Sequence, residues 1–386
     1  ILSVIVNFFI GFSAGLSVLV SHLYGEKQYD RLSALVQSIF VTVLAFAVLF
    51  TAAGILLTEH LLTALSTPAE LIPQASLYLR IALGGMLAQL LYNTASAILR
   101  ALGNTTSALH YLAVAVVLNI VLDVLLLFVI PCGIAGAAAA TVIAQYASAL
   151  LALRKFRHLH GAWQLRLHRP FFQPAHLLPI LGTSIPAGLQ AVFMSISSLV
   201  IQTYINSFGY AAMAGMTVYA RVEGFLYYPL FAFGIALTSF IGQNVGAHDL
   251  VRVRAGLRVS LRIAAFGAMG MALAAGLAAP TLVTLFTDDP AVIENALDAV
   301  YYTFPFYFLY GINQIYIGAL RGLGDTLYPM MTALAAYCLF RVAWCWGWDM
   351  TGIHSMHIVY SAYSVSFFVM AGLLWLGCRR ALCRVS

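Results

Sequence analysis

Two carboxylates lie deep inside apolar stretches of this sequence. Asp123 is found in LNIVLDVLLLF and Glu223 in YARVEGFLYYP. An ionised carboxylate in hydrocarbon costs several kcal/mol unless it is paired, hydrated or protonated, and such residues therefore suggest functional sites. A buried carboxyl group can take up a proton in one state and release it in another, and it can also hold a cation. Both residues are candidates for that chemistry.

Asn119 lies four residues before Asp123. On a helix this spacing places both side chains on one face, so their oxygens could share a proton network or a Na⁺ ion. Thr141, on the next apolar segment, could add a hydroxyl group. The alternative is that Asn119 and Asp123 form a hydrogen-bonded pair with a structural role.

Glu223 has two possible cationic partners, Arg221 and Arg341. Residues two apart on a helix point away from each other, which makes Arg221 the poorer partner. Arg341 lies in its own apolar segment at a similar depth. We expect an ion pair between Glu223 and Arg341 that either holds the structure together or acts as a gate.

Residues 301–310, YYTFPFYFLY, are mostly aromatic. Each aromatic face attracts an organic cation by about 0.5–2 kcal/mol. This composition makes Tyr301, Tyr302, Phe306 and Tyr310, together with Gln190, candidates for a wall that faces a substrate. The alternative is packing plus an aromatic belt at the membrane interface. Some of these rings must face lipid, because the run covers every side of a helix.

Composition determines which elements can position these residues. Of 386 residues, 62% are hydrophobic and 8% are charged, and the mean hydropathy is +0.93. Soluble domains carry about 25% charged residues, so the chain is predicted to be an all-α integral membrane protein. A β-barrel is excluded because the apolar runs are continuous rather than alternating. Eleven runs of spanning length are found, at 1–23, 33–58, 75–98, 108–130, 134–153, 178–206, 211–244, 256–286, 295–320, 327–348 and 355–378.

Basic residues fall in alternate loops, after the odd-numbered runs, whereas the intervening loop TDDPAVIE (287–294) is acidic. The positive-inside rule then places the basic loops and the C-terminus in the cytoplasm. We expect a multi-pass protein of the plasma or inner membrane. This placement accounts for the net charge of +6, which does not imply a nucleic-acid partner. The five cysteines have no metal-ligand spacing, so no metal site or organic cofactor is expected.

One short phrase occurs twice, as LRALGNT at 99–105 and as LRGLGDT at 320–326. The same offset of 221 residues aligns 17–28 with 238–249 without a gap. This predicts a tandem duplication whose two copies cross the membrane in the same direction. The second copy begins near His176, so the first copy is expected to lack one helix and the start of the next. Twelve helices are therefore expected in a complete protein, and about eleven here.

The repeat divides the chain into an N-lobe at 1–153, a basic cytoplasmic linker at 154–176 and a C-lobe at 177–386. Gly103 and Gly324, each just beyond a helix, are predicted to be turn or C-cap glycines. The repeated phrase is therefore interpreted first as a repeated helix exit.

Several stretches resemble the MATE family of multidrug and toxin extrusion antiporters. They are 119–130 with 133–145, the repeated LRALGNT and LRGLGDT, YARVEGFLYYPL (219–230) and TSFIGQNVGA (238–247). The resemblance covers nearly the whole chain. It implies two pseudo-symmetric six-helix lobes and export of organic, often cationic, small molecules by alternating access, in exchange for H⁺ or Na⁺. The protein would then be a monomeric transporter in a lipid bilayer and not an enzyme.

The resemblance also implies residue roles. Asn119, Asp123 and Thr141 match polar positions of the family's N-lobe cation site, and Tyr78 matches a fourth. The acids of NorM-type C-lobes are absent from the sixth and ninth spans, which makes the chain more similar to DinF-type and related bacterial branches. Coupling is therefore expected in the N-lobe. The family's usual Asp on its first helix cannot be compared, since that helix is expected to be missing.

Other functions remain open. A lipid-linked oligosaccharide flippase of similar architecture would favour several intramembrane cations, and this sequence offers few. A membrane-embedded enzyme would need a nucleophile and a base. GFSAG (11–15) matches the G-x-S-x-G pattern, but it lies in an apolar span instead of a strand–turn–helix. Small residues at this spacing favour close helix packing. A passive channel would need neither the buried carboxylate nor the duplication.

Overall fold

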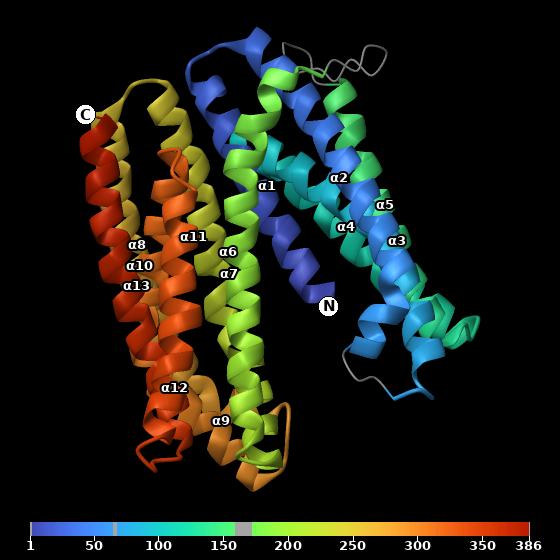
Figure 1. Cartoon of the computed structure of the whole chain (residues 1–386), viewed down its shortest axis with the longest axis vertical. Helices are drawn as coiled ribbons and strands as arrows, with labels where there is room; N and C mark the ends of the chain where they lie inside the picture. Colours follow the sequence, from blue (N-terminus) through green and yellow to red (C-terminus); the bar gives the residue numbers. More distant parts are fainter. Residues whose placement is uncertain (1, 65–67, 159–171, 386) are drawn as a thin grey trace. The chain divides into compact units, whose positions relative to one another are not determined.

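The computed structural model describes residues 2–64, 68–158 and 172–385, and the regular structure in these residues is helical (Figure 1). The chain divides into two compact units, Ile1–Gly188 (unit 1) and Leu189–Ser386 (unit 2). This division falls inside helix α6 (Pro174–Asn206), beyond the predicted linker at 154–176. Residues 159–171 of that linker lie outside the described residues, and its role stays a prediction.

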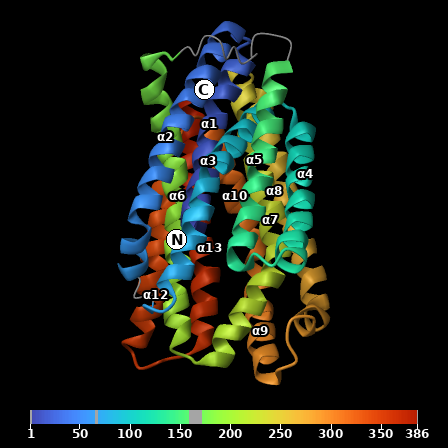
Figure 2. The same cartoon turned by 90° about the vertical axis from the view of Figure 1, so that its right-hand side faces the viewer.

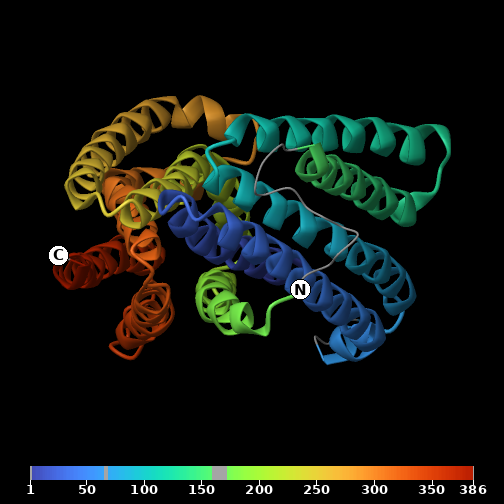
Figure 3. The ribbon, with the colours of Figure 1, turned by 90° about the horizontal axis from the view of Figure 1, so that it is seen from above.

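In the described residues, unit 1 contains the first half of α6 and five further helices. Helix α3 packs against α1, α2 and α5, and α4 packs mainly against α5. Helices α4 and α5 run side by side in Figures 2 and 3. Of the described residues of α4, only Ala108 is buried, and the exposed remainder is mostly apolar, as expected of a helix in lipid. These further helices are α1 (Leu2–Gly25), α2 (Tyr29–Ala64), α3 (Ile72–Ala101), α4 (Thr105–Val124) and α5 (Gly133–His158).

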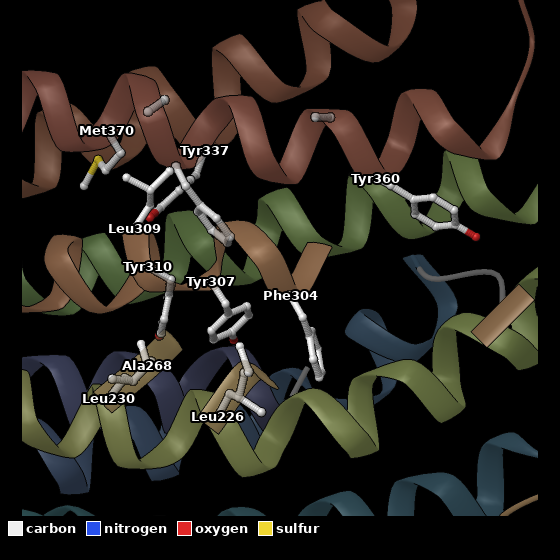
Figure 4. Packing of buried hydrophobic residues seen from close by; sticks show 14 of the residues in the cluster. Leu226, Leu230, Ala268, Phe304, Tyr307, Leu309, Tyr310, Tyr337, Tyr360 and Met370 are labelled. Atoms are coloured by element: carbon white, nitrogen blue, oxygen red, sulfur yellow. The ribbon is translucent and has the colours of Figure 1, made fainter. Parts of the chain in front are cut away.

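Unit 2 contains the second half of α6 and seven further helices. Helix α7 packs against α8, α9 and α10, and α10 also packs against α8 and α13. The core is rich in aromatic residues: Tyr307 and Tyr310 project from α10 toward Leu226 and Leu230 of α7 (Figure 4). The helices are α7 (Tyr210–Gly246), α8 (Leu250–Thr284), α9 (Pro290–Thr303), α10 (Tyr307–Gly322), α11 (Leu327–Ala333), α12 (Arg341–Asp349) and α13 (Met356–Val385).

All eleven apolar runs are helical in the described residues, and ten helical segments are long and apolar enough to cross a membrane. The remaining run, 295–320, was expected as one span but is interrupted by a 3₁₀ turn at Phe304–Phe306 between α9 and α10. Pro305 accounts for the break, because proline lacks an N–H and its ring crowds the preceding turn. Pro186 and Pro229, by contrast, lie inside continuous helices.

The predicted repeat is confirmed by the positions of the helix ends. Helix α1 ends at Gly25 and α7 ends at Gly246, again 221 residues later. The residues that follow both adopt a left-handed backbone, Lys27 with φ 58° and His248 with φ 56°. Two turns related by the offset therefore share an unusual conformation, which shows that the copies have the same local fold.

The repeated phrase is a helix end followed by a helix start. Gly103 (φ 82°) and Gly324 (φ 94°) are left-handed, as a C-terminal cap requires. The next N–H closes each cap: Asn104 donates to the Leu99 carbonyl at 2.8 Å, and Asp325 to the corresponding Leu320 carbonyl at 2.9 Å. The Asn104 and Asp325 side chains then accept from the backbone N–H three residues later. This explains the match of Asn with Asp, since both cap a helix N-terminus well.

GFSAG is a close-packing site, as its position in an apolar span predicted. Gly11 and Gly15 of α1 meet the backbone of α6 at Ala187 and Thr183, within unit 1. A Cβ atom at Gly15 would lie 2.5 Å from the Thr183 carbonyl oxygen and 2.6 Å from Ser184 Cα. Ser13 is buried between these glycines, 3.5 Å from the Thr94 hydroxyl, and has no base beside it among the described residues.

Gly15→Ala is therefore expected to lower the stability of unit 1 by about 1–3 kcal/mol, because the backbone of α6 must move away. Gly84→Ala on α3 is the matched control, since nothing lies within 4 Å of a Cβ at that position. Thermal unfolding in detergent should show a lower midpoint for the first variant and an equal or higher midpoint for the second. Equal midpoints for both variants would contradict the packing argument.

Candidate functional site

The polar residues predicted in unit 1 meet at the contact of α4 and α5. Asn119 Nδ2 donates to Thr141 Oγ1 at 3.4 Å, and the Thr141 hydroxyl donates to the Ala137 carbonyl at 3.2 Å. Asp123 lies one helical turn beyond Asn119 on α4 and is partly exposed. It forms no hydrogen bond or ion pair with the described residues, so the hydrogen-bonded Asn119–Asp123 pair that was the alternative to a cation site is not formed in this conformation. The carboxylate is left open to an ion.

Tyr78, on α3, is 39% exposed. No hydrogen bond joins it to Asn119, Asp123 or Thr141 within the described chain. Its assignment to the same site stays a prediction.

Sequence reasoning missed a second polar bridge in unit 1. Gln145, one turn after Thr141 on α5, donates to Gln89 of α3 at 3.3 Å. Tyr146 donates to the Gly84 carbonyl at 3.0 Å. The four-residue spacing of Thr141 and Gln145 was the available signal, because it places both on one face of α5. Polar side chains therefore connect α5 both to α4 and to α3.

The backbone of α4 changes just beyond Asp123. A π-helical segment, Leu125–Val129, begins two residues later and ends the span. Such segments are rare and are frequent at functional sites, because they leave the regular hydrogen-bond ladder. No residue pattern predicts this segment, since LLLFV has the composition of an ordinary apolar helix.

In unit 2, Glu223 lies on α7 against the start of α10. The Tyr307 hydroxyl donates to Glu223 Oε1 at 3.0 Å. One turn earlier on α7, the Tyr219 hydroxyl accepts from the Thr303 hydroxyl at 3.0 Å. Sequence reasoning identified Glu223 but missed Tyr219, Thr303 and Tyr307 as its neighbours.

Arg341 is buried at the start of α12, with 5% of its surface exposed. Its Nη2 donates to the Ser366 hydroxyl at 2.9 Å, and its guanidinium lies over the rings of Tyr337 and Tyr363, 4.9 and 4.3 Å from their centres. Arg341 acts on Glu223 electrostatically. The two do not form a direct ion pair, since the ion pairs within 4.0 Å among the described residues are Arg80–Glu59 and His354–Asp349.

The five residues proposed as a substrate wall have different environments in unit 2. Tyr301 and Tyr302 are 51% and 40% exposed near the end of α9, and Phe306 is partly buried. Tyr310 is buried and stacks on Tyr227 at 5.3 Å. Gln190 is buried and accepts from Arg321 Nη2 at 2.8 Å. Tyr310 and Gln190 are thus core residues here, and only the residues of α9 and the 3₁₀ turn expose part of their surface.

A second arrangement unforeseen from the sequence lies at the end of unit 2 where α12 and α13 join. His354 Nδ1 lies 2.7 Å from Asp349 Oδ1, and its Nε2 lies 3.2 Å from Ser207 Oγ. The order resembles an Asp–His–Ser hydrolase, but the Ser207 hydroxyl donates to the Tyr204 carbonyl at 2.7 Å. The imidazole also stacks on Phe208 at 4.1 Å. The proton of the Ser207 hydroxyl is directed away from His354. These contacts therefore stabilise the loop between α12 and α13 and do not activate a nucleophile.

The chain is similar to known membrane proteins. A family model described as MatE matches residues 1–125 and 186–346, which include Asp123, Glu223 and Arg341. The probable multidrug resistance protein YpnP of Bacillus subtilis (strain 168) is 29% identical over 349 residues, covering 87% of this chain and 75% of that protein. The probable multidrug resistance protein NorM of Aromatoleum aromaticum is 28% identical over 356 residues, covering 89% and 75%.

Solved structures show the same fold. The outward-facing conformation of a multidrug resistance MATE family transporter of the MOP superfamily superposes with a TM-score of 0.92 at 20% identity, covering all of this chain and 86% of that one. The resemblance inferred from short motifs is thereby confirmed at the level of fold. Because the family model covers well over half of the residues, the chain belongs to the MATE family of multi-pass membrane transporters.

Proposed function

We propose that this protein is a secondary active exporter of organic, often cationic, compounds, driven by inward flow of H⁺ or Na⁺. Membership of the MATE family and relatives described as multidrug resistance proteins support the direction and the class of substrate. The observation that carries the proposal is Asp123, an ionisable group in an apolar span with no partner among the described residues, one turn from the Asn119–Thr141 hydrogen bond. A carboxylate in this position is energetically unfavourable unless a proton or a cation is bound to it.

The coupling ion would bind between α4 and α5. Asn119 uses its amide nitrogen for Thr141, which leaves its Oδ1 as an acceptor or ligand. A proton would join the Asp123 carboxylate, and the resulting acid could donate to an oxygen of this group. A Na⁺ ion would instead take oxygens from Asp123, Asn119 and Thr141, the hard ligands that such cations prefer.

Exchange requires that ion and substrate favour different conformations of the same protein. Binding of the ion neutralises Asp123 and removes the free-energy cost of a charge in hydrocarbon. The ion-loaded form can therefore bury this site, whereas the empty form prefers a conformation in which the site is open to water. Alternating access with the C-terminus in the cytoplasm, by a monomer, then converts an inward ion gradient into outward substrate flow.

The test is transport by the purified protein in liposomes, with pH and Na⁺ gradients imposed separately and ethidium as the substrate. We expect one of the two gradients to drive ethidium movement, and an ionophore that collapses that gradient to stop it. Ethidium movement that is indifferent to both gradients would refute a coupled exporter and leave a passive pathway.

The flippase alternative receives less support from the charges. The buried arginines in the described residues are Arg321 and Arg341, and both are engaged with protein groups, Gln190 and Ser366. An anionic lipid-linked sugar would call for cations directed at the ligand.

A further inference from the structure

Two hydrogen bonds hold α7 on either side of the break at Pro305. Thr303, the last residue of α9, donates to Tyr219, and Tyr307, the first residue of α10, donates to Glu223. Each pair is four residues apart, Tyr219 with Glu223 and Thr303 with Tyr307, so one face of α7 spans the break. The carboxylate is thus bonded to the first residue beyond the 3₁₀ turn.

The surroundings of Glu223 are suited to a group that gains and loses a proton. Its side chain is partly buried, and its hydrogen-bond partners are two phenols, Tyr307 and Tyr219, rather than a direct cation. Arg341, the cation that acts on it, is held by Ser366 and two tyrosine rings. A carboxylate compensated only at a distance is easier to protonate than one in a direct ion pair. The ionisable groups that act on Glu223 are Tyr219 and Tyr227 of its own helix, Tyr307 and Tyr310 of α10, Arg341 of α12 and Tyr363 of α13.

We propose that Glu223 is a proton-binding site of unit 2, separate from the Asp123 site of unit 1, and that its charge sets the bend between α9 and α10 through Tyr307. In the ionised form the Tyr307 hydroxyl donates to a carboxylate. Uptake of one proton from water makes the acceptor a neutral carboxylic acid.

Protonation of Glu223 affects the break between α9 and α10. A hydrogen bond to an ionised acceptor is roughly twice as strong as one between neutral groups, so protonation loosens the hold on α10. The bond between Thr303 and Tyr219 joins neutral hydroxyls and does not end on the carboxyl group, although Tyr219 also bonds Glu223 and Thr303 also bonds the Ala299 carbonyl, so α9 keeps a contact with α7. The helix lacks the normal backbone ladder at Pro305 and is free to change its angle there. Low pH therefore releases α10 while α9 remains fixed.

The bend can be measured by electron paramagnetic resonance between spin labels at Glu294→Cys on α9 and Leu327→Cys just after α10, in a background without the native cysteines. Both sites are exposed. We expect the distance distribution of the otherwise unaltered protein to change between alkaline and acidic pH. Glu223→Gln, which mimics the protonated acid, should give the acidic distribution at every pH.

Asp298→Asn is the matched control, because it makes the same change at an exposed position of α9. Both Asp298→Asn and Asp123→Asn should keep the full pH response, which separates this site from the coupling site. A second variant, Tyr307→Phe, retains the carboxyl group: infrared difference spectra should still show the band of a protonated acid, while the bend no longer follows pH. A pH response that persists in Glu223→Gln, or an acid band that does not depend on Glu223, would overturn the proposal.

Discussion

Asp123→Asn is expected to reduce gradient-driven ethidium efflux to the level of membranes that lack the protein, while the protein still inserts. The amide keeps the size of the side chain but can neither bind a proton nor supply a negative charge to Na⁺. The effect should be complete because the described residues place no second acid beside the Asn119–Thr141 pair. The measurement is ethidium transport in inverted membrane vesicles, with the amount of inserted protein determined by immunoblot.

Asp288→Asn is the control for this experiment, since Asp288 lies in the exposed loop before α9 and should leave efflux unchanged. Asn119→Ala and Thr141→Val remove neutral ligands, so they should raise the ion concentration needed for half-maximal efflux and not abolish it. Wild-type efflux by Asp123→Asn would exclude this carboxylate from coupling.

Arg341→Gln is expected to destabilise unit 2 by roughly 3 kcal/mol, because it removes a buried charge with charge-assisted hydrogen bonds and two ring contacts. It also leaves the Glu223 charge without its compensating cation. If the two charges interact, Arg341→Gln should cost less in a Glu223→Gln background, by about 1 kcal/mol or more. Thermal or denaturant unfolding of the two single variants and the double variant in detergent measures this difference.

The outcome distinguishes two roles of Arg341. Strictly additive losses would show that Arg341 acts only on Ser366, Tyr337 and Tyr363, and that Glu223 does not depend on it. The neutral pair Trp344 and Ser361, joined at 3.0 Å between the same two helices, provides a control without a charge. Trp344→Phe should destabilise the protein equally in both Glu223 backgrounds.

Much of the fold could be predicted because the forces that fix it act locally. Continuous apolar runs predicted the helices, and the offset between LRALGNT and LRGLGDT predicted turns that proved to share left-handed residues and caps. Local patterns do not report the division of the chain inside α6. The first half of α6 belongs to unit 1, where Gly11 and Gly15 let α1 approach it closely, a contact between segments more than 150 residues apart.

The candidate site was predictable in its residue types and less so in its contacts. Asn119 and Thr141 meet as expected, because one face of α4 is turned to the next helix. The partner of Glu223 is a phenol, although charge alone suggested Arg341. Sequence ranks partners by charge and depth, but side-chain geometry decides which group comes within bonding distance. The π-helical segment after Asp123 had no compositional signal at all.

The break at Pro305 has a mechanical consequence. The offset of the repeat places Phe304–Phe306 opposite residues 83–85, and α3 is a single continuous rod there. One copy thus has a joint where the other is stiff, although the turns after α1 and α7 are alike. Similar halves of a molecule need not deform alike: any flexing of unit 2 is concentrated at one proline, whereas α3 must tilt as a whole.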